Sequence, residues 1–405
     1  MKFDRNGVCC NCGKDFIKSS RNHVYCSPPC KSEHDKTRRS VGVITHCRVC
    51  GKEFSISQTR KVYCSDECRE KGGRPLTPDE EIKKAELLAI EKKVRADVGR
   101  TRILADLLEE SVTQINAKDI KPYRVPKAKT KRDPETMVIL RSDTHPGLIT
   151  PSYNLDEFHR RMELFTEKII LIHDIIAQTI PIERIVIMDL GDLVSGQGIF
   201  ANQAWKTQVH VLKQIYAEAA PEFISQNLAL LEYAPVVEDH YVPGNHGRTG
   251  KEYPDEVNFD NVLSQDIWRR FEFINRVEVY PEWGWFKYVD IYGWRFLMMH
   301  GHLVRSWLGI PWYGLVTKGM KWQGSMPKGP WQYLVHGHFH VQFTFPWNMI
   351  EKGRSRGFRI ISNGSLVSDD DFALEQLGMA SSPAQVVFGV HPEHGITWRY
   401  ELDLS

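Results

Sequence analysis

Five short motifs of aspartate, histidine and asparagine are spread over the last two thirds of the chain, each behind an apolar run. In order they are Asp143-Thr144-His145, Gly191-Asp192, Gly244-Asn245-His246, His300-Gly301 and Gly337-His338-Phe339-His340. Imidazole nitrogens and carboxylate or amide oxygens are ligands for Mn²⁺, Fe and Zn²⁺. Any one of these motifs occurs by chance in many proteins, but five in succession predict a catalytic metal site.

A second set of metal-binding residues is a cysteine repeat near the N-terminus. Two units have the same spacing, C-x2-C-x13-C-x3-C, and comprise Cys9, Cys12, Cys26 and Cys30, then Cys47, Cys50, Cys64 and Cys68. Four thiolates at this spacing suit one tetrahedral Zn²⁺, so we expect two structural zinc ions. Cys10 lies outside the repeat, because Arg48 stands at the corresponding position of the second unit. The pattern resembles treble-clef and zinc-ribbon modules.

Composition argues against the alternative of a disulfide framework and excludes several protein classes. The N-terminal residues have no apolar core of a secretory signal, and no cysteine follows Cys68, so disulfides are disfavoured. No apolar run reaches the roughly 18 residues of a membrane span. With 41% hydrophobic residues in periodic patterns, the chain is not disordered. We expect a cytoplasmic protein with no membrane partner.

Charge divides the chain into a basic head and an acidic body. Residues 1–135 carry 30 Lys and Arg against 20 Asp and Glu, whereas the remaining residues carry 23 against 31. Residues 1–74 alone carry 16 against 8. This excess favours a polyanionic partner, with nucleic acid, and DNA in particular, as the expected one. A protein-docking role or a solvated basic surface remains open for the zinc units.

The elements that must position the five motifs follow an α/β pattern. Short β-rich runs precede every motif, and helical periodicity fills about Asp156–Gln178 and much of Gln203–Glu232. Side chains beyond the carboxyl ends of such strands are where an α/β site is expected. The runs at Asn363–Ser365, Gln385–Val390 and Gly395–Asp403 are predicted to be strands that close a second sheet.

We predict four parts in the chain. They are zinc module 1 (1–38), zinc module 2 (39–74), a helical and basic linker (75–134) and a catalytic domain (135–405). Thr77-Pro78 is typical of a helix start, and helical spacing continues to about Ile115. This linker could form a hairpin, a helix-turn-helix or a coiled coil, so self-association or a protein partner through it is a further expectation.

The five motifs in this order resemble those of the calcineurin-like metallophosphoesterases, over about Met137–Leu404. The resemblance implies a β-sandwich flanked by helices and a dinuclear metal site, with Mn²⁺ the first choice and Fe or Zn²⁺ the alternatives. It implies that one ion is held by Asp143, His145 and His340, the other by Asn245, His300 and His338, and both by Asp192. A hydroxide between the ions would attack phosphorus, with His246 beside the leaving group.

The sequence departs from the family pattern at two positions near His246. The acid of the family's GDxxDR motif is absent after Asp192, where Leu193-Val194-Ser195 follow, and Gly247-Arg248 follow the GNH motif. The first departure removes the group that would orient His246. The second leaves Arg248 as a candidate to contact a phosphate, although a surface role is an equal alternative.

Other histidines and aromatic residues have structural explanations as well as functional ones. His302 is the alternative to His300 as a metal ligand, and His336 is expected to pack beside the site. His159, His173 and His210 lie on helical patterns, and His391 and His394 in a C-terminal turn. The segment Leu303–Trp331 is rich in tryptophan and should border the active cleft, where its rings could stack on bases or pack under a loop.

These observations predict a metal-dependent phosphoric ester hydrolase. The first reading is a phosphodiesterase or nuclease acting on DNA, with zinc modules that bind nucleic acid. The chain resembles the DNA-repair exonuclease branch of the family, and its layout resembles that of bacteriophage proteins. The alternative is a phosphomonoesterase acting on a nucleotide or phosphoprotein, with the zinc modules as protein-docking elements.

Overall fold

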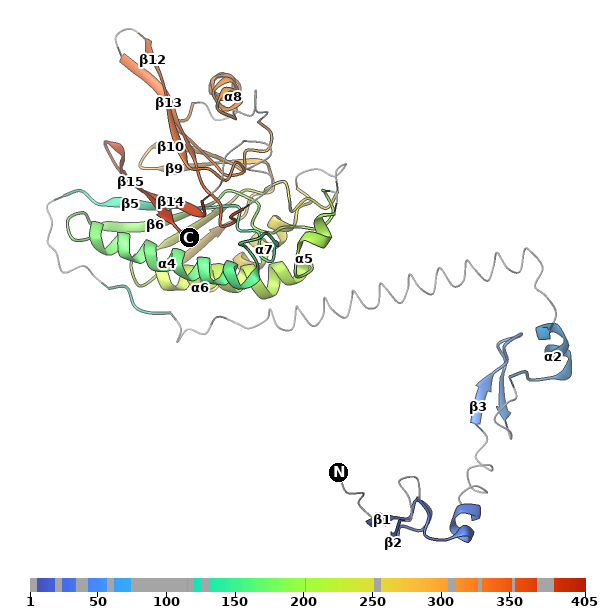
Figure 1. Ribbon diagram of the computed structural model, residues 1–405. Helices are drawn as coiled ribbons and strands as arrows, with labels where there is room; N and C mark the ends of the chain where they lie inside the picture. The colour runs from blue at the N-terminus through green and yellow to red at the C-terminus, as the bar shows by residue number, and fades with distance from the viewer. Residues whose placement is uncertain are drawn as a thin grey trace. The chain divides into compact units, whose positions relative to one another are not determined.

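A computed structural model gives the fold of the chain (Figure 1). It describes residues 6–18, 24–33, 43–56, 62–73, 115, 120–124, 132–200, 202–250, 256–304, 311–326, 330–351, 354–369 and 382–405. Contacts divide the chain into two units, Met1–Val98 and Gly99–Ser405. The helical linker predicted at 75–134 lies almost wholly outside the described residues, and the bounds of the four predicted parts remain predictions.

Each zinc module is a short hairpin followed by a helix. The first has β1 (Asn6–Val8), β2 (Asp15–Ile17) and a helical turn at 28–33, and the second has β3 (Val43–His46), β4 (Glu53–Ile56) and α2 (Asp66–Gly73). Ser27 and Ser65 accept backbone hydrogen bonds from the cysteines three residues on, so both serines cap these helices.

The first of two large sheets carries the strands that precede three of the motifs. Its order is β15-β14-β5-β6-β7-β8, and β5 to β8 are parallel. The bounds are β5 (Glu135–Arg141), β6 (Ile182–Asp189), β7 (Val237–Tyr241), β8 (Val277–Tyr280), β14 (Ala384–His391) and β15 (Gly395–Asp403). All of β5 is buried, because both faces of the sheet are covered.

The second sheet carries the strands that precede the other two motifs. Its order is β12-β13-β11-β10-β9, with β10 parallel to β11. The bounds are β9 (Phe286–Ile291), β10 (Trp294–Met299), β11 (Tyr333–His336), β12 (Phe343–Glu351) and β13 (Arg354–Ser362).

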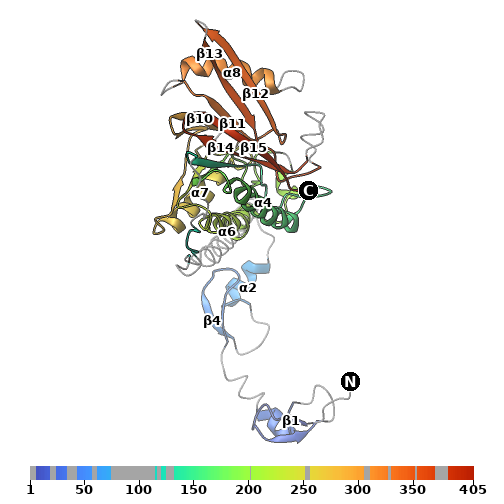
Figure 2. The same ribbon diagram turned by 90° about the vertical axis from the view of Figure 1, so that its left-hand side faces the viewer.

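Helices cover the outer faces of both sheets. They are α4 (Leu155–Ile176), η2 (Gln203–Lys206), α5 (Val211–Lys213), the π-helical η3 (Gln214–Ala219), α6 (Ala220–Leu230), α7 (Phe259–Phe271) and α8 (Pro311–Ser325). In Figure 1, α4 and α6 lie beneath the first sheet, and Figure 2 shows β10 to β13 above β14 and β15. No helix in the described part of the chain has the length and apolarity of a membrane span.

Alternation along β5 shows how the layers pack. Met137 and Ile139 face a core shared with α4 and α6, whereas Val138 and Leu140 face a core between the two sheets. A third core lies between the second sheet and α8, where Leu315 packs near Trp331. The predicted class, a helix-flanked α/β sandwich preceded by two small four-cysteine modules, is therefore confirmed.

One topological prediction is wrong. The strands β14 and β15 do not close the second sheet, because β14 pairs antiparallel with β5 at the edge of the first, with Val387 opposite Ile139. Asn363–Ser365 is a loop that follows β13 rather than a strand. Seven of the eight residues of β14 are buried, so its apolar pattern specifies burial without saying which sheet it joins.

A buried ion pair joins the last residues of β5 and β6, directly before two of the motifs. Arg141 donates to both oxygens of Asp189, at 2.6 and 2.7 Å, and to Gln226 Oε1 at 2.7 Å. Its guanidinium lies 3.8 Å from the centre of the Phe223 ring, and the residue is fully buried. The pair fixes the strand ends from which Asp143 and Asp192 project.

We expect Arg141→Met to destabilise the catalytic domain by about 3–5 kcal/mol, because it leaves the Asp189 carboxylate buried without its partner. Arg295→Met is the matched control, since Arg295 forms an exposed pair with Asp290 and should cost under about 1 kcal/mol. Urea denaturation of both variants measures the difference. An Arg141→Met protein as stable as Arg295→Met would show that the buried pair is not needed.

Candidate metal centre

The predicted ligands come together where the strands of both sheets end. Asp143 follows β5, Asp192 follows β6 and Asn245 follows β7, whereas His300 follows β10 and the last two histidines follow β11. Parallel strands place their carboxyl ends at one edge of a sheet. Two sheets packed face to face therefore deliver ligands to the same place from both sides.

A first group of possible ligands consists of Asp143, His145 and His340. Their ligand atoms lie within 4.8 Å of one another, and all three residues are buried. His340 Nε2 is 3.3 Å from Asp143 Oδ1. Backbone geometry also fixes this carboxylate, since the amide of His338 donates to both of its oxygens at 3.2 and 3.0 Å.

A second group is centred on Asp192, with His300 and His338. These ligand atoms also lie within 4.8 Å of one another. His300 Nε2 is 2.9 Å from both Asp192 Oδ2 and Asn245 Oδ1, which brings the predicted asparagine into the group. His300 Nδ1 donates to the carbonyl of Leu190 at 2.8 Å and so turns Nε2 toward the group.

Asp192 connects the two groups. Its Oδ2 lies 3.9 Å from His145 Nε2 of the first group and 2.9 Å from His300 Nε2 of the second. A carboxylate in this position can bind two ions at once and offset the repulsion between them.

The backbone at the site is held in an uncommon conformation. Asp143, His145, Asp192, His338 and His340 all have positive φ, between 42° and 73°, and they are five of the eight non-glycine residues with positive φ in the described structure. Such angles cost free energy and persist only where the surrounding structure enforces them, typically at functional sites. This independent feature coincides with the predicted ligands.

Two glycines allow the loops that carry Asp192 and Asn245 to touch. A Cβ on Gly191, whose φ is +87°, would lie 2.5 Å from the backbone nitrogen of Gly244. A Cβ on Gly244 would lie 2.1 Å from the backbone nitrogen of Asp192. Real atoms do not approach this closely, so any other residue at either position would separate the two ligand loops.

Electrostatics prepare the side chains to bind a cation. Burial opposes ionisation of Asp192, but the histidines around it, His300 foremost, hold its pKa well below the usual range. Burial, and after it the neighbouring His246, lower the pKa of His145 to about 3. Burial alone would lower the pKa of His300, but the Asp192 carboxylate raises it to about 9, so His300 holds a proton at neutral pH that a bound metal ion must displace. An ionised carboxylate and neutral imidazoles are the forms that ligate metal.

The donor set fits two divalent ions. Four histidines, two aspartates and one asparagine converge, and a third group of His145, Asp192 and His246 links the first two. Nδ1 of His145 is buried without a hydrogen-bond partner. A structural hydrogen-bond network therefore does not explain why this imidazole is buried here. Borderline nitrogen and oxygen ligands of this kind suit Mn²⁺, Fe and Zn²⁺.

Asp260, which the sequence analysis did not identify, anchors both ligand loops. Its carboxylate accepts hydrogen bonds from the backbone amides of Asp192 and Gly244, at 2.9 and 2.8 Å, and of Leu193 and Val194, both at 3.1 Å. It lies in the first turn of α7, behind the capping residue Asn258. The capping pattern Asn258-x-Asp260 was the available signal.

A second unpredicted network supports Asp143 from behind. The amide of Asn363 donates to Ser142 Oγ and Gln385 Oε1, at 2.9 and 2.6 Å, and Gln385 Oε1 accepts from the backbone of Ser142 at 3.1 Å. Ser365 Oγ donates to the carbonyl of Asp143 at 3.0 Å. These fully buried polar residues join β5, β13 and β14 at the site.

His246 forms a third group of possible ligands with His145 and Asp192, but it has no carboxylate partner of its own. Its Nε2 is 4.0 Å from Asp192 Oδ2, and its backbone amide donates to Asp192 Oδ1 at 2.7 Å. Two rings flank the imidazole, since His145 and Phe200 both have ring centres 4.7 Å away. Aromatic packing therefore takes the place of the missing acid. Arg248 is half-buried and donates to the carbonyl of Asn245 at 3.3 Å, close to the site.

The remaining histidines lie apart from the two groups or at their margin. His302 has its ring centre 5.6 Å from that of His300, and both of its nitrogens are buried without hydrogen-bond partners. His336 is fully buried on β11. His173 packs on Tyr233, and His210 caps α5. His391 and His394 stack on each other at the C-terminal turn.

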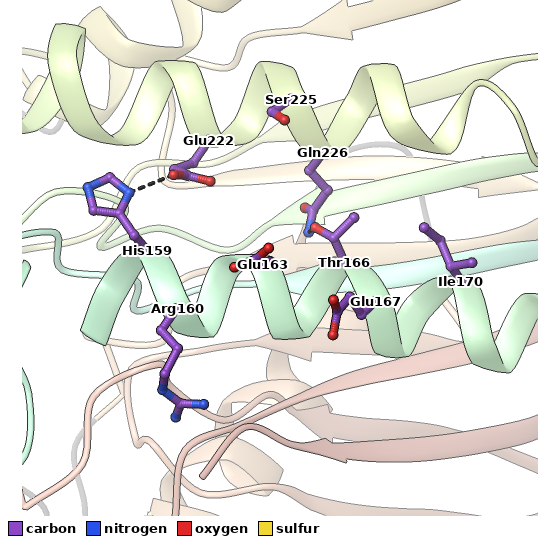
Figure 3. A pocket seen from close by; sticks show the side chains of 9 residues that line it. All are labelled: His159, Arg160, Glu163, Thr166, Glu167, Ile170, Glu222, Ser225 and Gln226. Atoms are coloured by element: carbon purple, nitrogen blue, oxygen red, sulfur yellow. Dashed lines mark hydrogen bonds and ion pairs between the residues drawn. The ribbon is translucent and has the colours of Figure 1, made fainter. Parts of the chain in front are cut away.

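A groove of about 560 Å³ between α4 and α6 is separate from the metal cluster (Figure 3). His159 lies in it, and both of its ring nitrogens have carboxylate partners, Glu222 at 2.5 Å and Glu218 at 2.9 Å. None of the predicted ligands lines the groove. His159 therefore serves a surface ion-pair cluster.

In the described part of the tryptophan-rich segment, the rings pack against neighbouring side chains and do not face the site. Trp331 is 1% exposed and lies against Phe358, with ring centres 4.8 Å apart. Trp322 packs on Trp285 at 5.5 Å. Tyr313 is the more exposed aromatic of α8, and Trp307 lies outside the described residues.

The eight repeat cysteines form two four-sulfur clusters with the same geometry, each within 4.8 Å. Neighbouring sulfurs are 3.4 to 3.6 Å apart, for example Cys12 and Cys26 at 3.6 Å, near the about 3.8 Å expected around a tetrahedral zinc. All are free thiols, and Cys10 stays outside. The clusters fit structural zinc.

Comparisons with known proteins found no matching protein-family model and no matching curated protein. Solved structures do align. Vps29 from Entamoeba histolytica, complexed with zinc, aligns at 11% identity and a TM-score of 0.29 over 66% of this chain and 99% of its own. A predicted phosphoesterase from Streptococcus pneumoniae gives 11% and 0.22 over 66% and 98%. A 5'-nucleotidase from Candida albicans gives 10% and 0.28 over 70% and 54%. With TM-scores this low, function must be inferred from the side chains of the site.

Proposed function

We propose that the chain is a dinuclear-metal-dependent phosphoesterase, and specifically a phosphodiesterase that cuts DNA. The observation that supports it most is the position of one buried carboxylate, Asp192, beside His145 of the first ligand group and His300 of the second. A site for two ions with one shared carboxylate is the arrangement used for in-line displacement at phosphorus.

Each predicted ligand has a place in this proposal. Asp143, His145 and His340 hold one ion, Asn245, His300 and His338 hold the other, and Asp192 holds both. When bound, two divalent ions supply an activated water nucleophile and neutralise charge on the phosphoryl oxygens. Mn²⁺ is the ion we expect, with Fe and Zn²⁺ as alternatives.

Two further side chains act on the substrate in this proposal. His246 lies at the margin of the cluster with its side chain 30% exposed, so it can reach a leaving-group oxygen and give it a proton. Arg248, half-buried behind Asn245, contacts a non-bridging phosphate oxygen or the neighbouring phosphate.

The zinc modules deliver the nucleic acid. Lys14 and Lys52 occupy equivalent positions of the two repeats, and both are exposed, as are Lys31, Arg48 and Arg69. Positive side chains bind the phosphate backbone without reading its sequence, so binding should weaken steeply with salt. Protein docking by these modules is the other outcome that the following test can reveal.

The test is Mn²⁺-dependent cleavage of end-labelled single- and double-stranded DNA, beside the small diester bis-p-nitrophenyl phosphate. We expect DNA cleavage by the wild type and a loss of about 100-fold or more in His340→Ala, since a ligand to one ion is removed. His394→Ala is the matched control, because His394 is exposed and remote from the cluster. The product ladder distinguishes exonuclease from endonuclease action.

Hydrolysis of the small diester alone would keep the metal site and overturn the choice of DNA. Hydrolysis of phosphomonoesters only would support the nucleotide or phosphoprotein phosphatase instead. No hydrolysis of any ester would contradict the proposed function as a whole.

A further inference from the structure

The turn between β6 and α5 presents one aromatic side chain at the metal cluster. The ring centre of Phe200 is 4.7 Å from that of His246, with the planes tilted by 46°. Phe200 is nevertheless 45% exposed. Nearly half of Phe200 is therefore accessible to a ligand beside the cluster.

A buried glutamine holds this turn to the backbone of His246. Gln203 is 6% exposed, and its side-chain oxygen accepts hydrogen bonds from the amides of Ile199 and Phe200 at 2.8 and 3.2 Å. Its side-chain nitrogen donates to the carbonyls of Ser195 and His246, at 2.5 and 3.2 Å. Phe200 is therefore fixed directly to the residue expected beside the leaving group.

The rest of the turn is fixed on both sides. Gln214, fully buried in the π-helical η3, accepts from the amide of Ser195 at 2.9 Å and donates to the carbonyl of Val209 at 3.0 Å. The amide of Ile149 donates to the carbonyl of Lys206 at 2.8 Å, which ties the turn to the segment after His145. A π-helical turn inside a helix frequently marks a functional site.

These contacts give a half-exposed aromatic ring a defined position beside a polar cluster. Rigid aromatic rings bind planar apolar groups at little cost in conformational entropy. In a nucleic acid, the planar group next to each phosphate is the base. Base–aromatic stacking is tolerant of sequence, because every base has a π-face.

We propose that Phe200 is the stacking platform for the nucleobase adjacent to the scissile phosphate. This inference rests on the proposed function and deepens it. A base inside a duplex is already stacked on its neighbours, so the platform favours unpaired nucleotides at the cleavage position. The substrate class is therefore single-stranded or frayed nucleic acid.

The test uses end-labelled ten-residue oligothymidylate with Mn²⁺, together with versions that carry one abasic residue moved stepwise along the strand. In the wild type, an abasic residue next to the cut bond should slow cleavage there by about tenfold. Phe200→Ala should cut the normal oligonucleotide about tenfold more slowly and show no further loss at the abasic residue, because both changes remove one interaction. Phe200→Tyr should retain the wild-type rates.

Trp205→Ala is the matched control on the same turn. Trp205 is 86% exposed and lies on η2, so we expect rates within twofold of the wild type. Unchanged cleavage by Phe200→Ala, or an equal loss on normal and abasic strands, would overturn the stacking platform while leaving the nuclease intact.

Failure of the wild type to cut any oligonucleotide would instead refute the proposed function. The inference is then decided by titrating the Mn²⁺-loaded protein with thymidine 5'-monophosphate and with 2-deoxyribose 5-phosphate. A tenfold tighter binding of the nucleotide that disappears in Phe200→Ala supports the platform. Equal binding of the two compounds contradicts it.

Discussion

Asp192→Asn should lower phosphodiester hydrolysis by on the order of 10³-fold or more, equivalent to about 4 kcal/mol of transition-state stabilisation. The substitution keeps the shape of the side chain and an oxygen able to accept from the amide of His246. It removes the negative charge that lies between His145 and His300. Without that charge, two cations would face each other with no shared anion, and the second ion should bind weakly.

The measurement pairs the rate on bis-p-nitrophenyl phosphate with the Mn²⁺ content of the dialysed protein. Asp290→Asn is the matched control, because Asp290 is an exposed carboxylate paired with Arg295 on the second sheet. We expect the control to keep its rate within twofold and to bind two ions per active site. A folded Asp192→Asn protein with wild-type activity would show that Asp192 does not bridge two ions.

Cys9→Ser should release one zinc ion and unfold zinc module 1. Binding of structural zinc is worth about 10–16 kcal/mol in small zinc-binding peptides, and units of this size have little other core. In the first module, Cys9 is the buried cysteine, at 2% exposure. Backbone amides, first that of Cys12, lower the pKa of its thiol to about 6, which favours the thiolate that binds metal.

Replacement of zinc by Co²⁺ measures the loss of this metal ion directly, because thiolate-to-cobalt charge-transfer absorption arises from the cysteine sites alone. We expect Cys9→Ser to halve the absorption of the full chain and to weaken its binding to labelled DNA at low salt. Cys10→Ser is the matched control next to it, since the Cys10 side chain lies outside the cluster. Equal absorption in both variants would show that the four-cysteine assignment is incorrect.

The strands before the motifs could be predicted because each is a short, continuous apolar run that ends in polar residues. The β-rich run expected before Gly191-Asp192 is β6, and the helix expected over about Asp156–Gln178 is α4. Sheet membership could not be predicted for β14, because a strand buried on both faces shows no alternation that identifies its neighbours.

The candidate site also has a part that could be predicted from the sequence and a part that could not. The seven predicted ligands could be located from motif order, and the structure brings all of them into two overlapping groups. Asp260 and Gln203 could not be found, since each acts through hydrogen bonds to backbone amides or carbonyls, and the partners follow from loop geometry. The tryptophan-rich segment Leu303–Trp331 was predicted to border the cleft, whereas the aromatic side chain that the structure places against His246 is Phe200.

The number and position of bound ions test the central claim most directly. Crystals of the wild-type chain soaked in Mn²⁺ should show two anomalous scattering peaks about 3.5–4 Å apart, with Asp192 between them. One peak should lie against Asp143 and His340, and the other against Asn245 and His300. A single peak, or none within the cluster at saturating Mn²⁺, would contradict a dinuclear phosphoesterase.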